Sequence, residues 1–439
     1  MIAQNNQQAR PYIYELDLMR PVTAVTVVAV HVLAFTQFLN HTQPGVQVQN
    51  GLITSVHFTR EVFMFITALA LAYVYYARPF EASRFWAKRS IGVLLPYCIW
   101  SIAYTWVNNS SQHSPAAFAK LALLNILTGN ASYQLYYILL TLQLYLVLPL
   151  FLLFLRHIQQ HPWRTLSISF ALQVLFLYFD YRYLQQGTLA SSGVWKVVAD
   201  SQDSFLLTYQ FYFILGGLAA LYLKQARAFV LRHCKWIVSG FVLALAAIWI
   251  HFLLQVNVYH ESLGYATSVL QPMMTFYSPV VIMLLCWLAC RWASRTNQQG
   301  RPKGYQFWHI LSDASFGIYL VHAFILTALL QRVVPVMPEA WPVALRVFLT
   351  WFLTAGGAAV ISILLMKTPI LSHLVGRSAH WHWSKDANAL QVWFSNSFLA
   401  ACLSAGITAR TQFVWLAGRL QKVIPFHRTR EVERKESVR

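Results

Sequence analysis

The sequence predicts an all-α fold, a polytopic membrane helix bundle of about ten transmembrane helices with both termini in the cytoplasm. The 439-residue chain is 57% hydrophobic and only 11% charged, which is not the composition of a soluble globular protein. Ten apolar segments approach the length needed to cross a bilayer. The basic residues gather in alternate short loops, as the positive-inside rule describes.

The predicted spans follow from hydropathy, since each is a long apolar segment bounded by polar or charged residues. In chain order they cover residues 21–39, 56–77, 90–107, 134–155, 165–180, 205–223, 236–254, 269–290, 311–330 and 343–366. The fifth is the shortest. Trp and Tyr gather near the span ends, as in an aromatic belt. We therefore expect residues 1–366 to form one membrane core.

Orientation follows from the loops after the even-numbered spans, which hold the larger share of Lys and Arg. These loops contain Arg78, Arg84, Lys88, Arg89, Arg156, Arg164, Lys224, Arg227, Arg232, Lys235, Arg291, Arg295, Arg301 and Lys303. The opposite loops and their edges contain Arg60, Lys120, Arg182, Lys196, Arg332 and Arg346. The bias places both termini in the cytoplasm.

The net charge of +19 does not indicate a nucleic-acid partner, because the basic residues report membrane topology. After the last span, residues 367–439 form a basic cytoplasmic tail. Within it, 389–417 is moderately apolar, and we expect an interfacial helix there. Four of the five cysteines lie in apolar segments and none forms a Cys-x-x-Cys pair. This pattern predicts packing roles and no metal site.

Two ionisable residues stand out in the first span. Arg20 and His31 are eleven residues apart, close to three helical turns, so both fall on nearly the same face, roughly 16 Å apart along the axis. Arg20 then lies at the cytoplasmic surface and His31 near mid-bilayer. Arg20 alone also fits a snorkelling anchor paired with Asp17, and His31 alone fits a structural hydrogen bond. The functional alternative is a desolvated general base.

Other candidate residues lie at span ends or at matched depth. His322 in the ninth span is predicted at a depth similar to His31. Lys88 and Arg89 open the third span, where they either mark topology or hold a phosphate group. Arg60 and Glu61 stand at the outer end of the second span, where they either pair or border an extracytoplasmic pocket.

Several of these stretches together resemble acyltransferase family 3, whose integral membrane members have a ten-helix core and carry acyl groups onto cell-surface sugars. The resemblance extends over about residues 14–366. It rests on Asp17, Arg20 and His31, on residues 63–67, on Lys88, Arg89 and 95–97, on Tyr136, Tyr137, Tyr145 and Pro149, on 213–217, and on 315–322. The chain departs from the family pattern at Ala68, where Gly is frequent, and at Gly92, where a basic residue is frequent.

The resemblance implies a mechanism and a site. The donor is acyl-CoA, most often acetyl-CoA, whose phosphates meet Arg20, Lys88 and Arg89 on the cytoplasmic side. His31 and His322 are the implied catalytic residues, with His31 as a base or a transient acyl carrier. The implied acceptor is the hydroxyl of a surface glycan or of its lipid-linked precursor.

Arg60, Glu61 and Tyr319 are the implied substrate-binding residues, and the implied location is the cell membrane. The alternative function is a polytopic transporter of a glycan or small solute, for which a carrier would show inverted repeats and broken helices near mid-membrane. Gly216–Gly217 and Gly356–Gly357 hint at such breaks. The two halves of the chain, however, do not echo each other.

Overall fold

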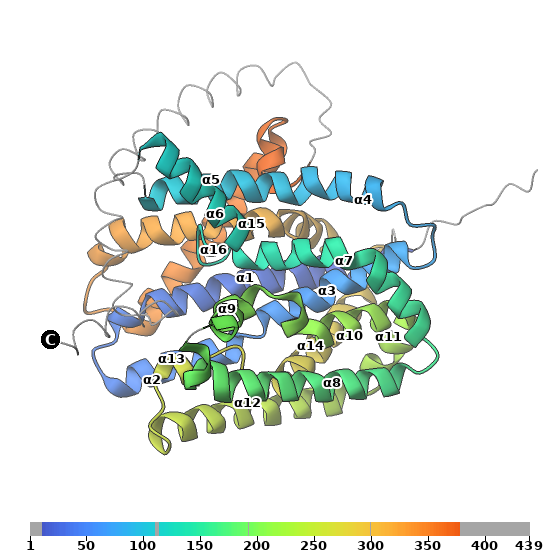
Figure 1. The fold of residues 1–439 in the computed structure, drawn as a ribbon, viewed down its shortest axis with the longest axis horizontal. Helices are drawn as coiled ribbons and strands as arrows, with labels where there is room; N and C mark the ends of the chain where they lie inside the picture. The colour runs from blue at the N-terminus through green and yellow to red at the C-terminus, as the bar shows by residue number, and fades with distance from the viewer. Residues whose placement is uncertain (1–10, 110–113, 192, 299, 378–439) are drawn as a thin grey trace, which may run out of the picture.

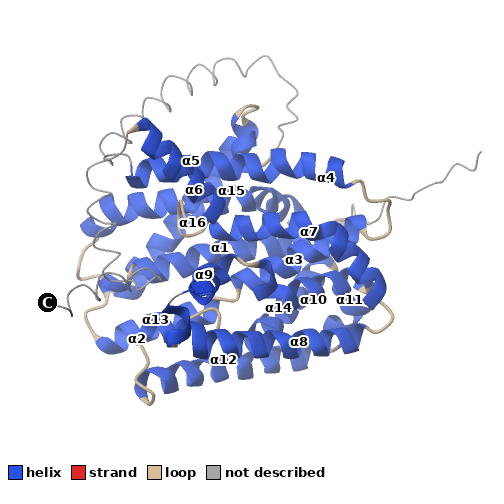
Figure 2. Cartoon of the chain, viewed as in Figure 1, coloured by secondary structure: helices blue, strands red, loops and turns tan. Residues whose placement is uncertain are grey.

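The computed structural model describes residues 11–109, 114–191, 193–298 and 300–377, and these form a bundle of helices (Figures 1 and 2). Over this part of the chain there is no strand, only an isolated bridge between Thr296 and Pro302. The all-α prediction is confirmed. The predicted interfacial helix at 389–417 lies outside the described residues.

The α-helices follow the predicted spans, with shorter helices between them. Their bounds are α1 Glu15–Phe35, α2 Gln43–Val56, α3 Thr59–Tyr75, α4 Ala82–Arg89, α5 Leu95–Asn109, α6 Pro115–Thr128, α7 Tyr136–Ile158, α8 Pro162–Phe179, α9 Gly193–Ser201, α10 Gln210–Leu221, α11 Leu223–Arg232, α12 Cys234–Asn257, α13 Leu263–Ala266, α14 Pro272–Ala293, α15 Tyr305–Arg332 and α16 Val343–Lys367. A π-helical turn, Ser90–Leu94, joins α4 to α5.

Eight helical segments of the described chain are long and apolar enough to cross a membrane, or up to nine if a bent pair is one span. The bent pair is Gly193–Ser204 with Leu206–Leu221, at 52°. The sequence predicted ten. When the bent pair is counted as the sixth predicted span, the remaining difference is α8, an 18-residue helix that corresponds to the fifth and shortest predicted span. The protein is a multi-pass membrane protein.

Helix α1 shows how a polar chain segment is made compatible with a bilayer. The hydroxyls of Thr23, Thr26 and Thr36 each donate to the carbonyl four residues earlier, over 2.7, 2.8 and 2.7 Å. These bonds hide the hydroxyl groups within the helix's own backbone. Helix α12, in contrast, has an apolar outer face, on which Trp236, Leu243 and Ile250, spaced seven residues apart, are exposed. Such an apolar outer face fits contact with lipid.

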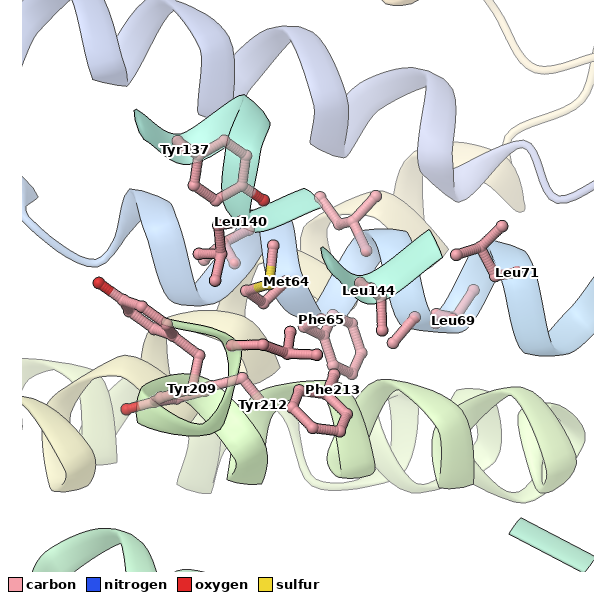
Figure 3. Close-up of a cluster of buried hydrophobic side chains, with 14 of the residues drawn as sticks. Met64, Phe65, Leu69, Leu71, Tyr137, Leu140, Leu144, Tyr209, Tyr212 and Phe213 are labelled. Carbon is pink, nitrogen blue, oxygen red and sulfur yellow. The ribbon is translucent and has the colours of Figure 1, made fainter. Parts of the chain in front are cut away.

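Helices α3 and α10 pack closely against each other at Gly216. A Cβ atom at Gly216 would lie under 3.0 Å from the carbonyl oxygen of Phe65 and 3.1 Å from the Cβ of Ala68. The glycine of this contact is therefore on α10, opposite the position where Ala68 departs from the family pattern. Figure 3 shows the surrounding core, in which side chains of α3, α7 and α10 interleave.

After α16 the chain turns back and packs on the bundle. The short helix Leu371–Val375 lies against α5, α15 and α16, and the indole of Trp100 donates to the carbonyl of Leu374 over 2.9 Å. Gly376, at φ +71°, sits so close to the carbonyl of Gly92 that a side chain has no room. Arg377 then bonds to Asp313 on α15. Packing onto the core thus continues past the predicted boundary at 366.

Candidate functional site

Helices α1 and α15 bring two histidines together inside the bundle. The rings of His31 and His322 are stacked, with centroids 5.4 Å apart and planes 21° from parallel. His322 is fully buried, whereas His31 is half-buried. Two residues separated by 291 positions in the sequence therefore form one imidazole pair.

The hydrogen bonds of His322 fix which ring nitrogen carries the proton. Its Nδ1 lies 2.8 Å from the carbonyl oxygen of Tyr319 and 3.2 Å from that of Ile318. Carbonyl oxygens only accept, so Nδ1 must be the donor and Nε2 of the neutral ring keeps its lone pair. This Nε2 is buried, and no described residue bonds to it. The arrangement presents a free basic nitrogen in a desolvated place.

Tyr133 completes the group, and sequence reasoning missed it. Its ring centroid is 4.4 Å from that of His31 and 6.2 Å from that of His322. Its hydroxyl is buried without a hydrogen-bond partner among the described residues. Tyr133 lies in the turn before α7, where no periodicity predicts the direction of a side chain. The predicted residue Tyr319 is also here, 5.9 Å from His322 by ring centroids, and its hydroxyl donates to the carbonyl of Gln134.

At the end of the bundle predicted to face outward, Arg60 is the centre of a polar cluster. Its guanidinium forms an ion pair with Asp203 at 2.9 Å, contacts the hydroxyl of Tyr209 at 3.2 Å, and lies 4.8 Å from the ring centroid of Tyr136. Asp203, another residue that the sequence did not single out, comes from the bent element before α10. Arg60 is also within electrostatic range of His31.

Glu61 does not pair with Arg60. Its side chain is only 2% exposed, and its Oε2 has no hydrogen-bond partner in the part of the chain that the structure describes. It lies within electrostatic range of Tyr136 and Tyr212. Of the two alternatives for Arg60 and Glu61, mutual pairing is thus not observed.

At the opposite end, Arg20 and Arg89 gather around Tyr145. The guanidinium of Arg89 lies 5.0 Å from the ring centroid of Tyr145, and Arg20 is within electrostatic range of the same residue. The π-helical turn follows Arg89 directly, and such turns occur often at functional sites. Lys88, the residue before Arg89, is exposed. Two guanidinium groups near the same side chain are suited to hold an anion by charge-assisted hydrogen bonds.

Asp17 lies within electrostatic range of Arg20 but forms no ion pair or hydrogen bond with it in the described structure. Within the described chain it bonds instead to the hydroxyl of Tyr12, at 2.9 Å, and lies 3.4 Å from Nδ1 of His309. Arg20 therefore forms no ion pair with an acid of the described chain, and its guanidinium is able to hold another anionic group. None of the described His, Cys, Asp and Glu side chains gather in a group of three or more that could hold a metal ion.

The chemistry of the site thus has three levels along the bundle. Arg20 and Arg89 form one level, His31, His322 and Tyr133 the next, and the cluster around Arg60 the third. The eleven residues between Arg20 and His31 in α1 correspond to roughly 16 Å. Basic imidazoles between a cationic end and a polar, aromatic end suit the transfer of a group between two aqueous sides of a membrane.

Comparison with known proteins agrees with this arrangement. A family model described as an acyltransferase domain matches residues 13–367, which include every element of the three levels. No curated protein and no solved structure matches the chain. The family match extends over most of the sequence, and the chain therefore belongs to acyltransferase family 3, the integral membrane O-acyltransferases.

Proposed function

We propose that the protein transfers an acetyl group from acetyl-CoA, bound at the cytoplasmic face, to a hydroxyl of an extracytoplasmic glycan or its lipid-linked precursor in the cell membrane. The stacked pair His31 and His322 is the observation that carries this proposal. Ionisable side chains are costly within a bilayer and mark a functional path there. The positive-inside bias of the loops supports the orientation, with both termini in the cytoplasm.

The donor side of the proposal rests on Arg20 and Arg89. CoA carries several phosphate groups, and guanidinium groups bind phosphate by paired, charge-assisted hydrogen bonds. Two arginines gathered around Tyr145, with no acid bonded to Arg20 among the described residues, suit that task. Lys88, exposed one residue before Arg89, adds positive charge at the rim of the same end.

The transfer itself needs a base near the middle of the bundle. The acceptor oxygen forms a bond to the acyl carbon, the thioester C–S bond breaks, and the hydroxyl proton passes to an imidazole. The CoA sulfur leaves as a thiolate and is then protonated. His322 offers the free Nε2 lone pair, and His31 shares a helix face with Arg20, which places it on the donor's path.

The acceptor side of the proposal is the cluster around Arg60. Sugars present many hydroxyl groups, and Asp203, Tyr209 and Tyr136 offer acceptors, donors and an aromatic face close together. Glu61 adds an unbonded carboxylate oxygen nearby. Tyr319 is within electrostatic range of Tyr136 and Arg60, its ring centroid is 5.9 Å from that of His322, and its hydroxyl donates to the carbonyl of Gln134.

The test of this function is mass spectrometry of surface polysaccharide from cells with and without the protein. We expect acetyl groups on the polysaccharide only when the protein is present. The transporter alternative gives the opposite pattern: labelled glycan crosses the membrane while labelled acetyl does not become attached. Unchanged acetylation together with lost glycan export would overturn the proposal.

A prediction for the donor end concerns Arg20. Replacing it with alanine is expected to raise the KM for acetyl-CoA about tenfold or more, because a charge-assisted hydrogen bond contributes about 1.5–3 kcal/mol. The effect on kcat is expected to be smaller. Initial rates at varied acetyl-CoA concentration measure both constants. Arg164→Ala, at an exposed arginine at the start of α8, is the matched control, and an equal response of both variants would contradict the phosphate role.

A further inference from the structure

Two buried tyrosine hydroxyls, those of Tyr133 and Tyr137, have no hydrogen-bond partner among the described residues, and of the two only the ring of Tyr133 contacts both His31 and His322. Tyr97, Tyr104 and Tyr277 each donate to a backbone carbonyl, over 2.6, 2.7 and 2.9 Å. Such partners are the rule, because a hydroxyl that is buried without one loses its hydrogen bonds to water and gains none in their place. The hydroxyl of Tyr133 is equally buried and bonds to no described residue. Its position is set by ring contacts with His31 and Phe35 instead.

The neighbouring imidazole has the complementary deficiency. Nε2 of His322 is a buried acceptor without a donor, whereas the hydroxyl of Tyr133 is a buried donor without an acceptor. The two rings meet edge to face, at 6.2 Å and 68°, and the two groups do not bond to each other. A bound group that offers one acceptor and one donor would satisfy both at once.

The reacting groups of an acyl transfer offer this combination. A thioester carbonyl oxygen accepts a hydrogen bond, and an attacking alcohol donates one. If the alcohol donates to Nε2 of His322, the carbonyl oxygen is the group left for Tyr133. From this geometry, and resting on the proposed function, we infer that Tyr133 is a catalytic residue whose hydroxyl donates a hydrogen bond to the acyl carbonyl oxygen.

The step then balances as follows. The alcohol oxygen bonds to the acyl carbon while its proton moves to Nε2 of His322. The carbonyl π electrons move onto the oxygen, and the hydrogen bond from Tyr133 stabilises the resulting negative charge. When the carbonyl re-forms, the C–S bond breaks and the CoA thiolate leaves. Tyr133 keeps its proton throughout. A donor held in place before the reaction stabilises such an oxyanion far better than water does.

The test is Tyr133→Phe, which removes only the hydroxyl oxygen. We expect kcat to fall about 100- to 1,000-fold, as for loss of one oxyanion donor, with the KM for acetyl-CoA unchanged. We expect the Tm of the purified protein to stay the same or rise, because an unsatisfied buried hydroxyl has been removed. The assay uses labelled acetyl-CoA and membrane vesicles from cells that make the native surface glycan.

Tyr277→Phe is the matched control, because its hydroxyl bonds to the carbonyl of Ser55 outside the site. That variant is expected to lower the Tm and leave kcat unchanged, the reverse of the Tyr133 result. A Tyr133→Phe protein with full kcat, or one whose loss of activity follows a lower Tm, would overturn the role of Tyr133. If the unaltered protein transfers no acetyl group at all, the proposed function fails instead.

Discussion

Replacing His31 by alanine is expected to lower acetyl transfer at least about 100-fold, because a positioned acid–base group typically contributes 10²- to 10⁴-fold. The folded structure should survive, since the side chain makes ring contacts with Tyr133 and His322 and forms no hydrogen bond with another described residue. The measurement is the acetyl content of surface polysaccharide, normalised to the amount of protein in the membrane.

The control for this variant is His157→Ala, at an exposed histidine at the end of α7. It should leave acetylation unchanged. Normal acetylation by the His31 variant at normal protein levels would contradict the proposed mechanism. A further measurement separates the two roles of His31: incubation with labelled acetyl-CoA in the absence of acceptor, followed by peptide mass spectrometry. Label on His31 would assign it as a transient carrier, whereas absence of label on the protein would exclude that role.

Gly216→Val is expected to destabilise the protein by about 1–3 kcal/mol or more, the range for overpacking of a well-packed core. Even its Cβ would meet the backbone carbonyl of Phe65 at under 3.0 Å, and backbone cannot rotate away as a side chain can. Helices α3 and α10 must therefore separate. The measurement is the Tm of the purified protein, together with its amount in the membrane.

Gly356→Ala is the matched control on α16, because an added Cβ there meets nothing within 4 Å. Alanine is better than glycine inside a helix by about 1 kcal/mol, so this variant should be as stable as the unaltered protein or more so. If Gly216→Val proved equally harmless, the close contact between α3 and α10 would not be a requirement of the fold.

The helices were predictable because a bilayer imposes one simple rule on sequence, a long apolar segment. Arg20 and His31 lie on one continuous helix, α1, so their spacing along one helix face follows equally simply from 3.6 residues per turn. The helix α2, Gln43–Val56, was not predictable in this way. It carries four glutamine and asparagine residues, and its polar side chains are satisfied by partners such as Gln37 and Asn257, which only the folded structure brings near.

The two site residues that the sequence did not identify, Asp203 and Tyr133, were unpredictable for the same reason. Asp203 meets Arg60 across 143 positions, and Tyr133 meets His322 across 189, both from segments between predicted spans. Neither segment has a periodic pattern that sets side-chain direction. The sequence therefore does not show which residues Asp203 and Tyr133 contact. The same limit applies to Lys88 and Arg89, adjacent in sequence yet facing different surroundings.

The return of the chain after α16 has a practical consequence for anyone who shortens this protein. The family model ends at residue 367, but the ten residues that follow supply the carbonyl that Trp100 binds and the guanidinium that Asp313 binds. Cutting at the end of the family match would expose the surfaces of α5 and α15 that these residues cover, and would remove Val375 from its contact with Gly317. A shortened protein for crystallisation or cryo-microscopy should therefore end no earlier than Arg377.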